Sequence, residues 1–255
     1  MIFKKNNINY NTRKAHRYLG LFIGIQFLFW TLGGLYFSWN NMDDVHGDTL
    51  LKHERTYFKD LNFATIQKGI DRIKLETKID STHSIRLIDL FGKPVAQYRY
   101  FEKGQVKLQL INATDGSLKA ALTEKECLEL VKGKLATKTA ITKTTLLEKN
   151  STGKHHEYRG RPLPAYVFEL DHYSNTTIYV STEQAQVMAV RNTNWRIFDF
   201  MWMLHTMDYD TRDHITNWVL RIFSVLGLVT IFSGFYLFFL TSPTLKKLRG
   251  KKKQK

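Results

Sequence analysis

Residues 18–42, YLGLFIGIQFLFWTLGGLYFSWNNM, and residues 222–245, IFSVLGLVTIFSGFYLFFLTSPTL, contain no charged side chain. A bilayer core about 30 Å thick needs roughly 20 apolar residues of helix to cross it. Both runs reach that length, so the sequence predicts transmembrane helices over 18–40 and 215–241. The first run is longer than the apolar region of a secretory signal and no small-residue cleavage site follows it, so we expect a retained anchor.

The basic residues indicate which way the chain crosses the membrane. Much of the net charge of +15 lies on two tails without acidic residues, 1–17 and 242–255. Positive flanks keep the end of a span in the cytoplasm and interact with anionic lipids. The sequence therefore predicts two cytoplasmic tails, the lipid bilayer as a partner and a central domain, 41–194, outside. Because the bases lie on tails rather than on a folded face, we expect no nucleic-acid partner.

The central domain is predicted to consist of two modules, at about 60–120 and 121–190. In each, a segment with helical spacing precedes segments that alternate as antiparallel strands. The predicted helices cover 63–73 and 123–135, and the predicted strands cover 84–90, 95–100, 106–111, 140–147, 165–170 and 177–180. The predicted fold class is therefore α+β, with two transmembrane helices flanking the modules.

Two patterns support a tandem repeat. At an offset of 68 residues, Tyr98 matches Tyr166 and Leu110 matches Ile178. Thr123 begins a capping box that marks the start of the second helix. Chance alignment of strand-rich sequence is the alternative.

Three further features restrict the chemistry of the outer domain. Cys127 is the single cysteine, so the domain has no intrachain disulfide and no multi-cysteine site. The polar stretch 149–164 contains His155 and His156 but lacks the spacing of a zinc site, and we interpret it as a solvated loop. No dinucleotide-binding fingerprint occurs, so any electrons must come from another protein or molecule.

Residues 195–214 are predicted to form an interfacial amphipathic helix. Spacings of 3, 4 and 3 place four residues on one face, namely Trp195, Phe198, Trp202 and His205. Such a stripe either packs against other protein or holds a flat cofactor, and the sequence leaves both interpretations open.

Short motifs in a fixed order run along most of the chain, and this order resembles the PepSY-associated transmembrane (PepSY-TM) family. The motifs are RKAHRYLGL at 13–21, GGLY at 33–36, NATDG at 112–116, LH at 204–205 and SGFY at 233–236. The resemblance implies tandem PepSY-like modules in the periplasm of a bacterial inner-membrane protein. It also implies a link to iron and siderophore uptake, in which some members are haem-containing reductases. Larger members have four spans, whereas two are predicted here.

The resemblance implies that histidines near the membrane boundaries ligate haem b. His16 and His205 lie in the matching motifs and are the expected ligands of haem iron, with His214 as a further candidate. His16 is expected on the inner side and the other two on the outer side, so His16 and His205 cannot share one iron. An inner haem would then need a homodimer, a partner membrane subunit or a different second ligand. An outer haem could use His205 with His214, or His46.

Arg221 is the remaining candidate site residue. It lies about one turn into the second predicted span, where a charge is costly unless it reaches the headgroups or pairs. Snorkelling to the outer surface is one interpretation, and contact with a haem propionate or another anionic ligand is the other.

Two functions follow as expectations. The first is a haem b-linked electron-transfer component that reduces ferric siderophores or other ferric chelates at the periplasmic face. The second is a non-enzymatic, membrane-anchored PepSY accessory or regulatory subunit of an envelope complex. No catalytic residues are predicted for either, because no nucleophile elbow, zinc-protease helix or carboxylate pair occurs in the outer domain.

Overall fold

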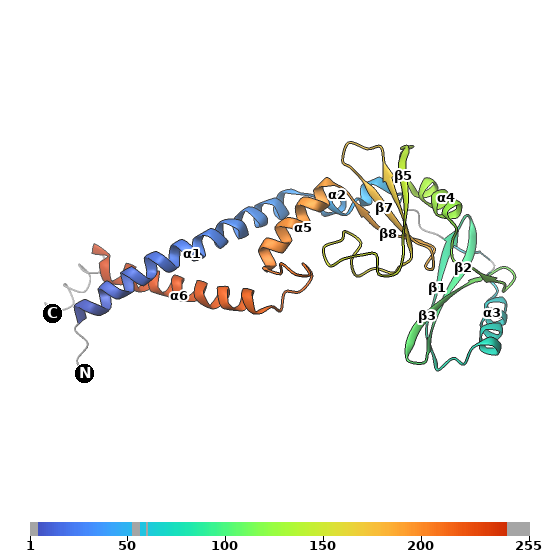
Figure 1. Ribbon diagram of the computed structural model, residues 1–255, viewed down its shortest axis with the longest axis horizontal. Helices are drawn as coiled ribbons and strands as arrows, with labels where there is room; N and C mark the ends of the chain where they lie inside the picture. Colours follow the sequence, from blue (N-terminus) through green and yellow to red (C-terminus); the bar gives the residue numbers. More distant parts are fainter. Residues whose placement is uncertain (1–4, 53–56, 60, 244–255) are drawn as a thin grey trace. The chain divides into compact units, whose positions relative to one another are not determined.

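The computed structural model describes residues 5–52, 57–59 and 61–243 and divides into two compact units (Figure 1). Unit 1 comprises Met1–Asn40 and Phe198–Lys255, and unit 2 comprises Asn41–Ile197. The helices are α1 (Lys5–Trp39), α2 (Met42–His46), the 3₁₀ helix η1 (Asp48–Leu50), α3 (Phe63–Glu76), α4 (Glu124–Lys134), α5 (Thr193–Thr206) and α6 (Trp218–Thr241). The strands are β1 (Ser81–Leu90), β2 (Lys93–Glu102), β3 (Gln105–Asn112), β4 (Leu118–Lys119), β5 (Ile141–Leu147), β6 (Ala165–Leu170), β7 (Thr177–Ser181) and β8 (Gln186–Arg191).

Unit 1 contains both helices that are long and apolar enough to cross a membrane. Their apolar segments are Tyr10–Trp39 and Trp218–Thr241, and few side chains of either are buried inside the chain. A helix that is apolar all round yet unburied is compatible with membrane anchoring. The first helix begins earlier than predicted, at Lys5, because the basic segment before residue 18 is also helical. Most of the second basic tail, from residue 244 onward, lies outside the described residues.

Within unit 1, α1 packs against two different helices along its length. At its middle, Phe22 contacts Phe223 of α6, with ring centroids 5.1 Å apart. Near its end, Phe37 contacts Phe198 of α5, with centroids 4.8 Å apart.

The helix predicted at 195–214 differs from the observed one in extent and surroundings. It is α5, it ends at Thr206, and it packs along the last turns of α1. Gln26 and Trp30 of α1 donate side-chain hydrogen bonds to the carbonyls of Leu204 and His205, both at 2.8 Å. The aromatic stripe of α5 therefore lies against another helix. Whether α5 also meets a membrane surface stays a prediction.

Unit 2 contains two four-stranded antiparallel sheets, which confirms the α+β fold class. The strand orders are β1-β2-β3-β4 and β5-β6-β7-β8. A helix precedes each sheet in the chain, α3 the first and α4 the second. The outermost strands β4 and β8 are not among the predicted strands. The predicted capping box forms at the start of α4, where Thr123 and Glu126 exchange hydrogen bonds.

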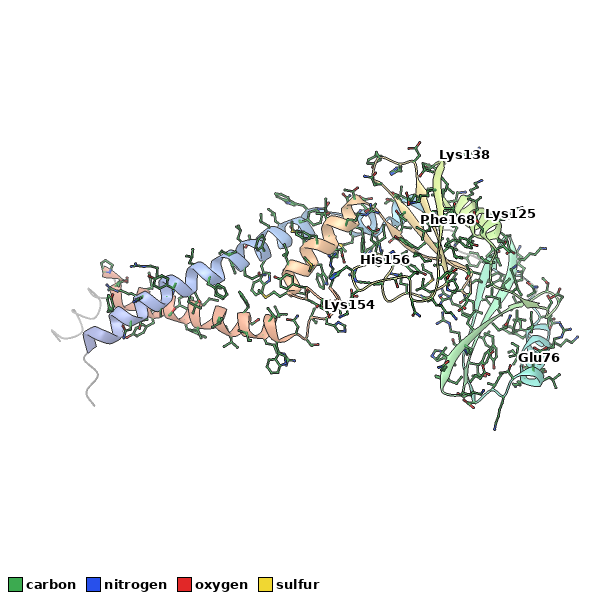
Figure 2. All side chains as sticks on the ribbon, viewed as in Figure 1. Glu76, Lys125, Lys138, Lys154, His156 and Phe168 are labelled. Atoms are coloured by element: carbon green, nitrogen blue, oxygen red, sulfur yellow. The ribbon has the colours of Figure 1, made fainter. Side chains whose placement is uncertain are left out.

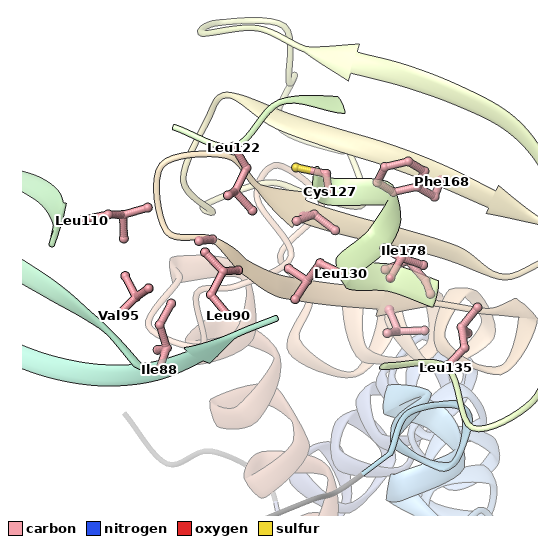
Figure 3. Close-up of a cluster of buried hydrophobic side chains, with 14 of the residues drawn as sticks. Ile88, Leu90, Val95, Leu110, Leu122, Cys127, Leu130, Leu135, Phe168 and Ile178 are labelled. Atoms are coloured by element: carbon pink, nitrogen blue, oxygen red, sulfur yellow. The ribbon is translucent and has the colours of Figure 1, made fainter. Parts of the chain in front are cut away.

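The first sheet is covered on both faces by apolar side chains, because neighbouring residues of a strand point to opposite faces. Ile111 of β3 packs with Ile66, Ile70 and Ile73 of α3. Its neighbour Leu110 instead joins a second cluster, which includes Cys127 and Leu130 of α4 and Phe168 and Ile178 of the second sheet (Figure 3). Burial within this cluster raises the pKa of the Cys127 thiol to about 12, so the thiol stays protonated and unreactive.

Candidate functional site in the paired helices

His16 joins α1 to α6 through a hydrogen bond within unit 1. Its Nδ1 lies 2.7 Å from the hydroxyl oxygen of Ser233. The same hydroxyl lies 2.8 Å from the carbonyl oxygen of Thr230, one turn back along α6. Serine has one hydroxyl proton, so both bonds form together only if Ser233 donates to Thr230 and accepts from His16. In that arrangement His16 carries its proton on Nδ1 and has a lone pair on Nε2.

A glycine beside His16 makes room for this ring. A Cβ added at Gly234 would lie 3.2 Å from Cε1 of His16 and 3.8 Å from Nε2. A methyl group at 234 would press on the imidazole, so the ring or the helix would have to shift by a few tenths of an ångström. The SGFY segment thus supplies both the hydrogen-bond acceptor and the space.

His205 lies in a different environment, among aromatic rings. The imidazole is nearly parallel to the Trp202 ring, with centroids 6.2 Å apart and an interplanar angle of 13°. Trp30 and Phe37 of α1 approach it with centroid distances of 5.9 and 6.1 Å. Phe198 stacks on Trp202 in turn, so three of the four residues of the predicted stripe do share one face of α5.

Among the described residues, Nδ1 of His205 is buried and has no hydrogen-bond partner. The residue borders a cavity of about 340 Å³, lined by Trp30, Trp202, His205, Thr206, Ile215 and Leu220.

His214 does not line this cavity. It lies in the loop between α5 and α6, with its side chain 70% exposed. Its Nδ1 lies 2.7 Å from the hydroxyl of Thr211 and 3.8 Å from a carboxylate oxygen of Asp208. Its exposed position gives no support to the expected pairing with His205 on one iron. His46 ends α2 in unit 2 and is exposed.

Asp208 organises the loop that carries His214. Its carboxylate accepts hydrogen bonds from the backbone N–H groups of Asp210, Thr211, Asp213 and His214 and from the Thr211 hydroxyl. Burial alone would raise the pKa of Asp208, but these hydrogen bonds outweigh it and hold the pKa well below its usual range. The loop therefore folds around an ionised carboxylate.

Arg221 lies on the first turn of α6 and is exposed. Its guanidinium carbon is 5.1 Å from the centroid of the Trp218 ring, a cation–π distance. This contact is compatible with snorkelling, because interfacial tryptophan and arginine both favour the headgroup region. Contact with an anionic ligand stays a prediction.

His16 and His205 are not brought together. His16 lies about 14 residues before Trp30 on α1, and Trp30 contacts His205. At 1.5 Å per residue this separation is roughly 21 Å along the helix. One chain therefore cannot place both imidazoles on one iron. Among the described residues, no group of three or more His, Cys, Asp or Glu side chains could hold a metal ion.

The sequence interpretation missed an arginine network in unit 2. The Arg191 guanidinium lies 3.9 Å from the Trp195 ring centroid, and its Nε donates to the Glu157 carbonyl at 3.0 Å. The Glu157 carboxylate accepts two hydrogen bonds from Arg196. Burial, followed by the charge of Arg161, lowers the pKa of Arg191 to about 10.

This network fixes part of the stretch 149–164, which carries Lys154 and His156 (Figure 2). Tyr158 in the same stretch is fully buried and stacks on Tyr179. The prediction of a solvated loop was therefore wrong for Glu157 and Tyr158. The arginines that flank Trp195 in the sequence were the available signal.

No protein-family model, no curated protein and no solved structure matches this chain.

Proposed function

We propose that this chain is a PepSY-TM protein of a bacterial inner membrane that carries haem b through His16 and serves in electron transfer. Both termini would lie in the cytoplasm and unit 2, as PepSY-like modules, in the periplasm. The apolar helices α1 and α6 and the basic residues around them support this placement. Ferric siderophores or other ferric chelates at the periplasmic face are the proposed electron acceptors.

The observation that carries the haem proposal is the hydrogen bond from His16 to Ser233. A histidine that ligates metal almost always donates its other ring N–H to a fixed acceptor. Ser233 supplies that acceptor because its own proton is directed to Thr230. Nε2 of His16 then has the lone pair that iron requires, and the missing side chain at Gly234 makes room for the imidazole. When bound, haem b would supply one-electron oxidation and reduction.

Each chain would contribute one such histidine, so the second axial ligand would come from another chain. A homodimer with two copies of His16 is the simplest arrangement, and a partner membrane subunit is the alternative. His205 lies roughly 21 Å from His16 along α1 and is too distant to provide the second axial ligand.

Absorbance of the purified full-length protein tests this proposal. We expect a Soret band that shifts on dithionite reduction and that His16→Ala removes. His155→Ala is the matched control, because His155 is exposed in a loop of unit 2 and its loss should leave the band unchanged. A colourless protein from haem-replete cells that also takes up no haem in titration would contradict the proposal.

A second candidate function is a membrane-anchored accessory subunit that binds a partner protein through unit 2. The observation in its favour is β1, a ten-residue strand at the edge of its sheet. Phe63 and Ile85 are 70% and 49% exposed and line an apolar hollow between α3 and β1. Edge strands pair readily with other chains. Site-specific crosslinking from His83 in β1 tests this function, and failure to recover a reproducible partner would contradict it.

A further inference from the structure

The cavity beside His205 has one unusual polar feature. Most of its lining is apolar or aromatic, with Trp30, Trp202, Ile215 and Leu220 forming much of the wall. Two polar groups of its other members are already used. The Thr206 hydroxyl donates to the Trp202 carbonyl at 2.9 Å, and the Trp30 indole donates to the His205 carbonyl at 2.8 Å.

The imidazole of His205 is the exception. Among the described residues its Nδ1 is buried and has no hydrogen-bond partner. A buried polar group without a partner costs about 1–3 kcal/mol. Its retention in an aromatic cavity points to a ligand that supplies a hydrogen-bonding atom.

The lining also restricts the charge and shape of that ligand. No Lys, Arg, Asp or Glu is among the six lining residues, so an ionised ligand would lie there without a counter-charge. Two indole rings suit a flat, unsaturated ring system. The volume of about 340 Å³ is at the small end of the roughly 300–1,000 Å³ typical of small-molecule sites.

We propose that this cavity binds the ring of a lipid-soluble quinone. The His205 imidazole donates a hydrogen bond to one ring carbonyl, and the indoles of Trp30 and Trp202 contact the faces of the ring. The isoprenoid tail leaves past Ile215 and Leu220, which belong to or adjoin the apolar helix α6. Ile215 is 59% exposed, so this side of the cavity is open.

Two other occupants agree less well with the same contacts. A lipid acyl chain would leave the imidazole without a partner. The propionates of a haem ligated by His205 would find no cation in the lining. The quinone proposal does not depend on His16 or on haem.

Fluorescence titration of the purified full-length protein with decylubiquinone and with menadione tests the proposal. Quinones quench nearby tryptophans, and Trp30 and Trp202 form the cavity wall. We expect saturable quenching that His205→Phe weakens roughly tenfold, the loss of one hydrogen bond. Phenylalanine keeps a ring next to Trp202, so the helix packing is preserved. His83→Phe, at an exposed position on β1, is the matched control and should bind as the wild type does.

A second variant tests whether the ligand occupies the cavity itself. Leu220→Trp should fill the cavity and abolish the saturable quenching, with circular dichroism melting as the check on folding. Equal affinity of wild type and His205→Phe, or no saturable quenching at all, overturns the proposal. A Soret band that His205→Phe removes and His16→Ala retains identifies haem as the occupant and also overturns it. A Soret band that His16→Ala removes and His205→Phe retains would support haem ligation by His16. It would leave the quinone proposal to be decided by the titration.

Discussion

His16 on α1 and His205 beside it lie near opposite ends of the apolar segment of α1, and their surroundings differ. His16 has a fixed acceptor for its ring proton and a glycine beside it. His205 has aromatic neighbours, an adjacent cavity and no polar partner among the described residues. A histidine with one nitrogen satisfied is prepared to give a lone pair to a metal. A histidine with a buried nitrogen that has no partner, beside a cavity, instead favours a ligand that can form a hydrogen bond.

The largest effect is expected where the His16 ring has the least space. Gly234→Leu would place a Cβ 3.2 Å from Cε1 of His16 and the rest of the side chain onto the ring. We expect the loss of bound haem and destabilisation of roughly 1–3 kcal/mol from overpacking, measured by absorbance and melting. Gly227→Leu is the control, since a Cβ there meets nothing within 4 Å. An equal loss of haem and stability in Gly227→Leu would show that the effect does not depend on contact with the His16 ring.

Ser233→Ala removes only the acceptor of the His16 proton. Loss of such an outer-shell partner costs 10–100-fold in metal affinity, so haem should dissociate about that much more readily. Haem transfer to apomyoglobin measures the change. Ser224→Ala serves as the control, because Ser224 makes the same kind of bond to its own helix, to the Leu220 carbonyl, without a histidine. An unchanged transfer rate in Ser233→Ala would mean that the His16 contact is only structural.

Asp208→Asn tests how the loop at the His205 end depends on charge. The folded-state pKa of Asp208 is depressed, so its stabilising contribution is present above the ordinary value of 3.8 and is lost as pH falls through the lower folded pKa. At neutral pH we expect a loss of about 1–3 kcal/mol in a melting experiment. The wild-type contribution should persist at pH 5. If the wild-type protein loses this stability between pH 7 and pH 5, the carboxylate of Asp208 is not the group that stabilises the loop.

Trp30→Phe should have the smallest effect. It keeps an aromatic wall at the cavity and removes the hydrogen bond to the His205 carbonyl, which contributes about 1 kcal/mol. Melting and quinone titration should therefore show a small loss of stability and a change in affinity of less than tenfold. Trp39→Phe is the control, because the Trp39 side chain is 78% exposed. An effect as large as that of His205→Phe would move the main contact of the ligand from the imidazole to the indole.

Local patterns explain what could be predicted from the sequence. Charge-free runs identified α1 and α6, the Thr123 capping box marked the start of α4, and the spacing of Phe198, Trp202 and His205 put them on one face. Each of these signals lies within a few turns of chain. The strand β8 was missed because Val187 and Val190 are three positions apart, and this spacing does not give the two-residue alternation by which the other strands were predicted.

The site depended on contacts that no local pattern contains. The partners His16 and Ser233 are 217 positions apart, and Trp30 and the His205 carbonyl are 175 positions apart. Neither pair has a periodicity or spacing that could be read in advance. The resemblance selected both histidines, but it could not tell that one has a serine acceptor and the other has none. That distinction arises only from the packing of α1 against α5 and α6.

The same long separations have a consequence for biosynthesis. Gln26 and His16 are exposed on α1 to whatever surrounds it until Leu204 and Ser233 have been synthesised. In a bilayer the nascent first helix would therefore hold two unpaired polar side chains during translation of all of unit 2. Chains released before α6 would lack the acceptor of His16, so this contact between the two apolar helices forms only after the whole of unit 2 has been made.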